Sequence, residues 1–356
     1  KSIWNMNKSF QDRFFQGIDF PLDKVIMIFS YNDSSLIDPI LLDRITEIKI
    51  KPYNTKDKLE ICDKHIIPEI IKDIGLSSSL LKWDQKILEY IIDNYTNEAG
   101  VRGIKRLVEK ICMSLNISRL KKEKMFKKNI KKITINKKVI IDILKEPSDD
   151  ETKIHPKSSI GIINGLYATT SGRGGIIPIQ IFKNFCGGVN SYEIKLTGNQ
   201  GDVMKESVAC SLTTALNYLE KNKKKYGIEN INEYLTKNFK YGFHVHTPST
   251  STPKDGPSAG GAFTSAFISL ILGKPIFNTV GMTGEIELTG RITKIGGLEF
   301  KLNGSKKAGV KTVYVPKENE KDVERIKKDY PKLIEKNLKV ITVKYIDDII
   351  DDILTK

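Results

Sequence analysis

The sequence predicts a mixed α/β protein of more than one domain, and three features of its 356 residues support this. In the first half, apolar residues recur at the three-to-four-residue spacing of helices. Residues 146–159 are polar and rich in Ser, Asp and Pro, which is typical of a linker. After this linker, strand-like runs alternate with helical ones, which favours a mixed α/β domain over residues 160–356.

Composition restricts the class of protein. The chain has 39% hydrophobic residues and no apolar run near the roughly 20 residues of a membrane helix, so we expect no membrane partner. The four cysteines are scattered without C-x-x-C spacing, which favours a reducing, intracellular compartment and no metal site. The chain begins at Lys1 rather than Met, so we expect it to be part of a longer protein.

The net charge of the chain leaves a second functional class, nucleic-acid binding, open. Net charge is 58 minus 43, or +15, and a basic chain can bind nucleic acid. Lysines are spread throughout among isoleucines and asparagines, without the aromatic-interleaved basic runs of nucleic-acid modules. Weak nucleic-acid binding is therefore an alternative rather than the first interpretation.

The first half predicts one strand and then a helical bundle. Residues 24–29, "KVIMIF", have the apolar run of a buried strand. After Pro52 the spacing becomes helical, and residues 133–144, "ITINKKVIIDIL", close the bundle. The expected core positions of the helices are Leu59, Cys62 and Ile66, then Leu88, Ile91, Ile92 and Tyr95, then Ile104, Leu107, Val108, Ile111, Cys112 and Leu115.

The second half predicts strands and at least two helices. Val208, Leu212, Ala215 and Leu219 place a helix after the turn "GNQG", and a second, apolar helix is expected over residues 259–272. The predicted strands are "GIIPIQIF" (175–182), "SYEIKLTG" (191–198), "FHVHTP" (243–248), "TVYVP" (312–316) and "LKVITV" (338–343).

The stretch "STPKDGPSAGGAF", residues 251–263, presents a serine in an unusual setting. Pro253, Gly256 and Pro257 indicate a stiff turn, and Ser258 then lies at the mouth of the apolar helix. Two interpretations fit this place. Ser258 is either an ordinary helix N-cap or a nucleophile presented by the loop.

A serine nucleophile needs a base, and the sequence offers histidine and lysine. His244 and His246 alternate on a predicted strand, so they share one face, but no third ligand makes them a metal site. Lys301 follows "IGGLEF" beside the apolar pair Leu298 and Leu302. Its stem either covers apolar neighbours while the ammonium reaches water, or the amine is buried and neutral enough to act as a base.

"TPKDGPSAG", "MTGEIELTG" and "IGGLEFK", in that order, resemble the Lon family of ATP-dependent proteases. "GDVMKES", "HVH", "AGVKTVYVPKEN" and "EAGVRGIKR" extend the resemblance over nearly the whole chain. It implies that Ser258 is the nucleophile and Lys301 the general base of a Ser-Lys dyad that cleaves protein substrates. Family members usually read G-G-L-K-E-K where this chain reads G-G-L-E-F-K, so Glu299 departs from the pattern and Lys301 does not.

The resemblance also implies supporting roles. Thr283 matches a threonine that contacts the catalytic lysine, and Asp255 matches an acidic residue linked to switching between inactive and active loops. His244 and His246 match histidines near the site. Gln180 ends a strand where the family often has an acidic residue, so that charge is absent here.

For the first half, the resemblance implies the end of an AAA+ ATPase module. Residues 1–51 match the end of its α/β core, and residues 52–145 match its small helical domain. Asn32 fits sensor 1, Arg44 the arginine finger and Arg102 sensor 2. The phosphate loop G-x-x-x-x-G-K-[ST] is absent from this sequence. We therefore expect ATP and Mg²⁺ to serve a full-length hexameric ring, and this chain to need no cofactor.

Two rival interpretations remain at this stage. One is a catalytically weakened AAA+ or nucleic-acid-binding homologue of the family, supported by the charge and by Gln180 and Glu299. The other is a membrane-attached protease of the same fold. The resemblance places the active protease in the cytoplasm, the mitochondrial matrix or another reducing compartment.

Overall fold

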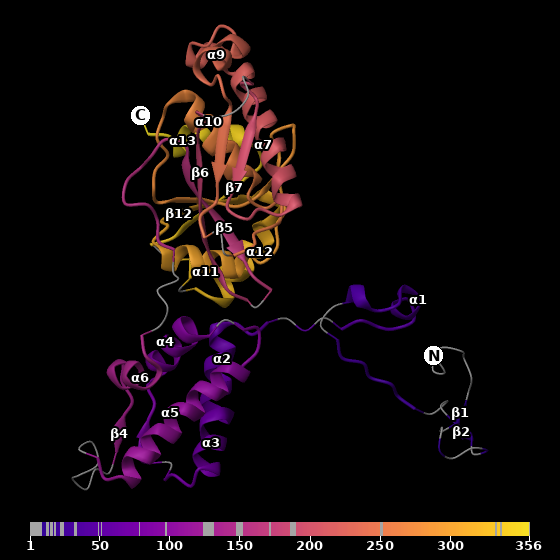
Figure 1. Cartoon of the computed structure of the whole chain (residues 1–356), viewed down its shortest axis with the longest axis vertical. Helices are drawn as coiled ribbons and strands as arrows, with labels where there is room; N and C mark the ends of the chain where they lie inside the picture. The colour runs from indigo at the N-terminus through magenta and orange to yellow at the C-terminus, as the bar shows by residue number, and fades with distance from the viewer. Residues whose placement is uncertain are drawn as a thin grey trace. The chain divides into compact units, whose positions relative to one another are not determined.

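The computed structural model describes residues 9–11, 14, 17, 19–21, 25–31, 34–48, 50, 52–77, 79–96, 98–123, 132–146, 152–170, 172–185, 190–249, 252–331, 333–334 and 337–355. Its internal contacts divide the chain into two units, residues 1–51 and residues 52–356. The second unit contains a helical bundle and a mixed α/β domain (Figure 1). The prediction of a mixed α/β fold is confirmed.

The first unit carries little regular structure in its described residues. Its elements are β1 (Ser9–Gln11), β2 (Asp19–Pro21), the 3₁₀ turn η2 (Ser34–Leu36) and α1 (Pro39–Leu42). The strand predicted over residues 24–29 is wrong for residues 25–29, which are exposed and unpaired; Ile26 is 87% exposed and Ile28 90%. A strand is stable only beside partner strands, and the described part of this unit offers residues 25–29 none.

The helical bundle contains the three helical segments whose core positions were predicted from apolar spacing. Its elements are α2 (Thr55–Ile61), a π-helical turn η3 (Cys62–Ile66), α3 (Ile67–Asp73), β3 (Leu81–Lys82), α4 (Gln85–Tyr95), α5 (Arg102–Leu120), β4 (Ile133–Thr134) and α6 (Lys137–Leu144). All of the predicted core positions belong to one hydrophobic cluster, so this prediction is confirmed. Apolar faces at helical spacing must pack together to leave water, and here they pack on one another.

The second half forms a seven-stranded sheet in the order β13-β12-β9-β5-β6-β8-β7. Its strands are β5 (Ile162–Ala168), β6 (Gly174–Lys183), β7 (Ile194–Thr197), β8 (Phe243–His246), β9 (Val280–Met282), β12 (Thr312–Pro316) and β13 (Lys339–Val343). Strand β6 pairs antiparallel with both β5 and β8, and the other pairs are parallel. A hairpin of β10 (Glu285–Ile286) and β11 (Ile292–Thr293) lies outside this sheet.

All five predicted strands are present, but two central strands were missed. β5 lies between β9 and β6, and its middle residues 163–166 are buried in succession, so its sequence shows no alternation of apolar and polar residues. β9 is only three residues long and contains Gly281. Neither a strand of three residues nor one whose polar residue is itself buried, such as Asn164 of β5, shows an alternating period in its sequence.

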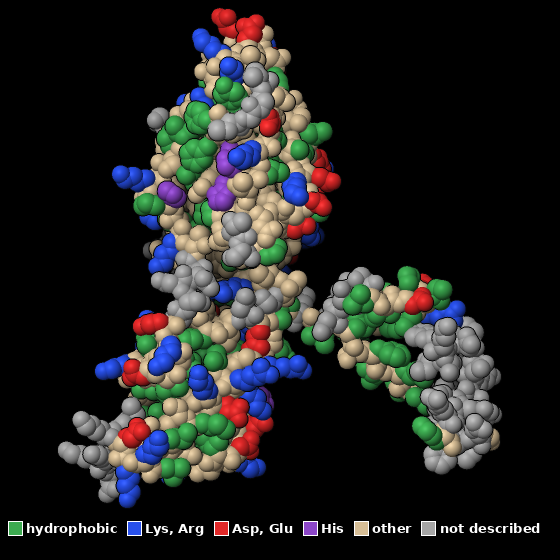
Figure 2. Space-filling view, in the orientation of Figure 1, with side chains coloured by type: hydrophobic (Ala, Val, Ile, Leu, Met, Phe, Trp, Pro, Cys, Tyr) green, Lys and Arg blue, Asp and Glu red, His purple; other side chains and the backbone are tan. Residues whose placement is uncertain are grey.

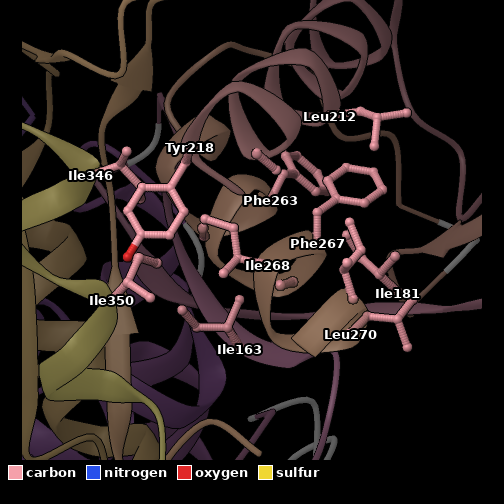
Figure 3. Close-up of a cluster of buried hydrophobic side chains, with 14 of the residues drawn as sticks. Ile163, Ile181, Leu212, Tyr218, Phe263, Phe267, Ile268, Leu270, Ile346 and Ile350 are labelled. Atoms are coloured by element: carbon pink, nitrogen blue, oxygen red, sulfur yellow. The ribbon is translucent and has the colours of Figure 1, made fainter. Parts of the chain in front are cut away.

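The core on one face of the sheet is built around α10 (Gly260–Leu272). Residues 260–271 of this helix are all buried, which is typical of a helix surrounded by protein. α7 (Asp202–Lys221) packs beside it, and Phe263 and Phe267 of α10 lie near Leu212 of α7 and Ile181 of β6 (Figure 3). Both predicted helices are confirmed. The remaining elements at this end are α8 (Lys223–Tyr226), α9 (Ile231–Asn238), η6 (Ile346–Asp348) and α13 (Ile350–Ile353).

A second core lies around α11 (Leu298–Ala308), with η5 (Lys317–Asn319) and α12 (Glu320–Asp329). Leu298 and Leu302 are buried with residues of β5 and β6. The helix approaches β6 closely because two glycines meet there: a Cβ on Gly304 would lie 2.1 Å from the carbonyl carbon of Gly174. α11 therefore occupies a fixed place on the sheet.

The predicted linker, residues 146–159, is only partly visible, since residues 147–151 lie outside the described residues. Its second part packs on the α/β domain. Ile154 contacts the core around α11, and Ser159 forms a bridge to Ile276. Residues 152–159 are thus held by the domain that follows them rather than spanning freely.

Candidate active site

Ser258, Thr283 and Lys301 meet at one point, although 43 residues separate the serine from the lysine. The Nζ atom of Lys301 donates to Ser258 Oγ at 2.9 Å and to Thr283 Oγ1 at 3.0 Å. The three side chains come from different elements: Ser258 precedes α10, Thr283 follows β9, and Lys301 lies in the first turn of α11. Only the packing of these elements brings the three together.

Ser258 is held by its own main chain. Pro257, Ser258 and Ala259 form a turn in which Gly260 N donates to Pro257 O at 3.0 Å. The carbonyl of Ser258 accepts from Gly284 N at 2.7 Å and from Thr283 Oγ1 at 3.2 Å. α10 begins only at Gly260, with Ala259 at the N-cap position and no side-chain cap. The N-cap interpretation of Ser258 is therefore wrong.

The small residues after Ser258 allow β10 to approach the start of α10. A Cβ on Gly260 would lie 2.9 Å from the backbone nitrogen of Ile286. A Cβ on Gly261 would lie 2.3 Å from Met282 Cε. Distances below 3.0 Å are closer than real Cβ contacts, so these positions require glycine or a shift of their neighbours.

Lys301 is buried along its whole length. It is 4% exposed, so the interpretation in which its ammonium reaches water is wrong. Burial lowers the pKa of Lys301 to about 8, because the charged form loses hydration that its two hydroxyl partners only partly replace. A substantial fraction of the amine is therefore neutral at mildly alkaline pH, with its nitrogen within hydrogen-bond distance of the Ser258 hydroxyl.

Asp255 lies three residues before Ser258 but contacts a different element from the lysine. Its Oδ1 accepts from Met204 N at 2.9 Å, in the first turn of α7. A carboxylate at a helix N-terminus satisfies a free N–H group and is stabilised by the helix dipole. In this structure Asp255 thus joins the loop to α7 by a hydrogen bond, and the Lys301 amine contacts Ser258 and Thr283.

His244 and His246 share Thr197 as a partner. Thr197 Oγ1 lies 2.9 Å from His244 Nε2 and 2.7 Å from His246 Nδ1. Gln180 of β6 lies directly opposite His246 in the ladder. Burial, and then the charges of Lys195 and His246, lower the pKa of His244. Histidines reach the surface on the α/β domain in Figure 2.

The structure gives the histidines no catalytic partner or metal ligand set among its described residues. No hydrogen bond joins His244, His246 or Gln180 to Ser258 or Lys301 there. Within the same residues no three His, Cys, Asp or Glu side chains converge as a metal site. Cys62, Cys112 and Cys210 are free thiols, and Cys186 lies outside the described ranges.

Comparison with known proteins agrees with this geometry. A family profile described as the Lon protease (S16) C-terminal proteolytic domain matches residues 134–356, and one described as the Lon protease AAA+ ATPase lid domain matches residues 72–130. The chain belongs to the Lon protease family.

Its relatives come from a virus and from bacteria. The chain is 43% identical to a Lon protease homolog of Acanthamoeba polyphaga mimivirus over 402 residues, covering 98% of this chain and 38% of that protein. It is 35% identical to Lon protease of Campylobacter jejuni over 350 residues (97% and 42%) and to Lon protease 1 of Bacillus subtilis over 350 residues (98% and 42%). The chain thus spans about two fifths of the length of the curated relatives it matches.

Glu299 is a departure from the Lon pattern two residues before Lys301, and its side chain contacts a tyrosine. Its carboxyl hydrogen-bonds the hydroxyl of Tyr330, which follows α12. Burial raises the pKa of Glu299, and burial together with the neighbouring Glu299 carboxylate raises the pKa of Tyr330 to about 12. The pair joins α11 to the segment after α12 within the Lon proteolytic domain.

Arg102, predicted as sensor 2, lies in the region that matches the Lon lid domain. Arg102 is exposed at the first residue of α5, and the carboxylate of Glu98 accepts from Gly103 N at 2.8 Å and Ile104 N at 2.9 Å. Sequence reasoning missed this role of Glu98, because a carboxylate four residues before the helix is not one of the usual start signals. Arg44 is exposed just after α1, and Asn32 lies outside the described residues. No helix in the described part of the chain has the length and apolarity to cross a bilayer.

Proposed function

We propose that this chain carries the proteolytic centre of a Lon-type serine endopeptidase, with Ser258 as nucleophile and Lys301 as general base. The observation that carries the proposal is the buried Lys301 amine 2.9 Å from Ser258 Oγ, with its pKa lowered to about 8. A serine hydroxyl needs an adjacent base, and a lysine becomes one only when it is desolvated. Both requirements are met by these two side chains.

The reaction is acyl transfer in two halves. The neutral Lys301 amine takes the proton of Ser258 Oγ as this oxygen attacks the peptide carbonyl carbon. The ammonium so formed then gives that proton to the leaving amine as the C–N bond breaks, which leaves an acyl-enzyme on Ser258. Water attacks the ester, gives a proton to Lys301 Nζ, and that proton returns to Ser258 Oγ as the acid product leaves.

Thr283 orients the base in this proposal. Its hydroxyl donates to Ser258 O at 3.2 Å and so offers its lone pairs to Lys301 Nζ at 3.0 Å. One N–H of the lysine is then fixed on Thr283, which directs the remaining positions of the nitrogen toward Ser258 Oγ. A positioned base is worth more than a mobile one because it is already in reach of the proton.

The oxyanion of the tetrahedral intermediate needs backbone N–H donors. The N–H groups of Gly260 and Gly261 are already bound to Pro257 O and Gly284 O, each at 3.0 Å. Pro257 has no N–H. The amides of Ser258 and Ala259 are therefore the donors we assign to the oxyanion, in place of the first amides of the helix.

Peptide hydrolysis by single variants tests the dyad. Ser258→Ala removes one oxygen and should lower kcat by about 1,000-fold or more with native far-UV circular dichroism retained. Lys301→Arg keeps a positive charge but cannot deprotonate, so it should be equally inactive. Ser159→Ala, which removes a surface hydroxyl, is the control and should hydrolyse peptide as the wild type does.

The pH profile adds a second readout. Only the neutral amine accepts a proton, so kcat/KM should rise with pH through about 8 and then level off. Activity of Lys301→Arg at a tenth of the wild-type rate or above, or a profile flat between pH 6.5 and 9.5, would refute the dyad.

For the whole protein we propose an ATP-dependent protease. The match to the Lon AAA+ lid domain and relatives named Lon protease support this. Arg44 and Arg102 would then serve nucleotide sites of a hexameric ring that uses ATP and Mg²⁺ and feeds protein substrates to Ser258, in a reducing compartment. Size determination and ATPase assay of the full-length protein test this, and an ATPase-inactive monomer would contradict it.

No specific observation favours a nucleic-acid function. In Figure 2, Lys and Arg side chains are interspersed with Asp and Glu over the visible face instead of gathering into one patch. Nucleic-acid binding needs clustered cations along the path of the phosphates.

A further inference from the structure

A second lysine, Lys254, lies four residues before Ser258 and is surrounded by carbonyl groups. Its Nζ donates to Gly198 O at 3.0 Å, to Ser249 O at 2.7 Å and to Thr252 O at 3.0 Å. An ammonium has three N–H donors and no acceptor, so these three carbonyls use all of them. Such a cradle requires the charged form of the lysine.

The main chain of the same residue is joined to the turn between β7 and α7. Lys254 N donates to Asn199 O at 3.0 Å, and Gly201 N donates to Lys254 O at 2.7 Å. Together with the bond from Nζ to Gly198, these contacts attach the loop before Ser258 to residues 198–201. Gly198 and Asn199 both have positive φ, 107° and 55°, which turns their carbonyls toward this loop.

The residues between Lys254 and Ser258 continue the attachment along α7. Asp255 accepts from Met204 N at 2.9 Å, and Pro257 O accepts from Ser207 Oγ at 3.3 Å. Gly201 is needed here, since a Cβ at this position would lie 2.5 Å from Asp255 Cγ. The loop is therefore fixed at successive points until it reaches the nucleophile.

Lys254 is the rival of Lys301 as a base, because it is closer to Ser258 in sequence and burial lowers its pKa too. The geometry separates the two. Lys301 Nζ contacts hydroxyl groups, one of them the nucleophile, whereas Lys254 Nζ contacts backbone carbonyls. A neutral amine at Lys254 would have two N–H donors for three carbonyls, so one of the three contacts would be lost.

We propose that Lys254 is a positioning residue: its charged ammonium gathers the carbonyls of Gly198, Ser249 and Thr252 and so sets Ser258 in reach of Lys301. This inference rests on the proposed Ser258–Lys301 dyad. It assigns opposite charge states to two lysines of one site, since Lys301 acts when neutral and Lys254 when charged. A displacement of Ser258 by about 1 Å is enough to lower the rate by about 100-fold.

The first test compares Lys254→Met with the wild type in peptide hydrolysis. Methionine keeps most of the length of the side chain and removes all three donors, so kcat should fall by about 100-fold. KM should change little, because the three donors of Lys254 are used by backbone carbonyls. Lys205→Met is the matched control: Lys205 belongs to the start of α7, to which the Lys254 loop is joined, but its ion pair with Asp202 is exposed. The control should retain wild-type kcat.

The second test distinguishes a charged positioning group from a base. Lys254→Ala is assayed with added n-propylammonium, and each rate is divided by the wild-type rate at the same pH, which removes the contribution of Lys301. Rescue by the charged amine should be constant between pH 7 and 9. Rescue that grows about tenfold per pH unit would show that the neutral amine acts, and would overturn the proposal.

Other outcomes are equally decisive. Lys254→Met within threefold of wild type, or Lys205→Met as impaired as Lys254→Met, contradicts the positioning role. Loss of native circular dichroism in both Lys254→Met and Lys254→Arg assigns the lysine to the stability of the fold and also contradicts it. If Ser258→Ala stays active, the dyad itself fails; if Ser258→Ala is inactive and Lys254→Met is not, only the present inference fails.

Discussion

Replacing the buried Lys301 by methionine should abolish peptide hydrolysis and yet make the protein more stable at neutral pH. Methionine has nearly the same length and shape but needs no hydration. The wild-type lysine is 4% exposed and has hydroxyl partners that cannot fully replace water around a charge. The substitution therefore removes a buried charge from the native state.

The magnitude follows from the pKa. In the unfolded chain Lys301 has its ordinary pKa of 10.5, and in the native state about 8. Below pH 8 both states are charged, and the cost of burying the charge is fully present. Between pH 8 and 10.5 the unfolded state holds more protons, so the native state gains stability as pH rises. From pH 7 to pH 10 this gain amounts to about 2.5 kcal/mol for the wild type.

The variant lacks this gain. Its advantage over the wild type at pH 7 is about 3 kcal/mol from the pKa difference, reduced by about 0.5–1.5 kcal/mol for each of the two lost hydrogen bonds. The lost bonds contribute similarly at both pH values. The free energy of unfolding of the variant minus that of the wild type should therefore fall by about 2.5 kcal/mol between pH 7 and pH 10.

Urea unfolding followed by far-UV circular dichroism at pH 7, 8, 9 and 10 measures this difference. Other groups titrate in both proteins and cancel in the comparison. Lys311→Met, which removes an exposed lysine from the same domain, is the control and should keep a constant difference from the wild type. A difference for Lys301→Met that is independent of pH would refute the reasoning that burial keeps the amine poised near neutrality.

Three further outcomes are expected. Thr283→Val keeps the shape of the side chain but loses the hydrogen bond to Lys301, so kcat for peptide hydrolysis should fall by about 10- to 100-fold. His246→Ala should change kcat least, and a larger loss in His246→Ala than in Thr283→Val would contradict the role assigned to Thr283. Gly304→Ala forces a methyl group against Gly174 and should lower the free energy of unfolding by about 1–3 kcal/mol, measured in urea; an unchanged midpoint would show that α11 can move away. The chain should show no micromolar ATP affinity in calorimetry with Mg²⁺, because its sequence has no phosphate loop, and tight binding would show that Arg44 and Arg102 suffice.

Local patterns were enough to predict the helices of the bundle and most strands of the seven-stranded sheet. The stripe from Ile104 to Leu115 is buried because apolar residues at helical spacing have one way to leave water. The strand predicted over residues 24–29 shows the limit of such patterns. An apolar run specifies a strand only when partner strands are present, and the described residues around 25–29 supply none.

The sequence by itself placed Ser258 between a stiff turn and an apolar helix, since both are encoded by consecutive residues, 251–272. It also placed Lys301 beside Leu298 and Leu302 but left open whether the ammonium reaches water. Only the tertiary structure decided this, because burial depends on β6 and Gly174 closing on α11. The partners of both amines were likewise decided by tertiary structure: Ser258 and Thr283 reach Lys301 from other elements, and Gly198 reaches Lys254 from the turn after β7.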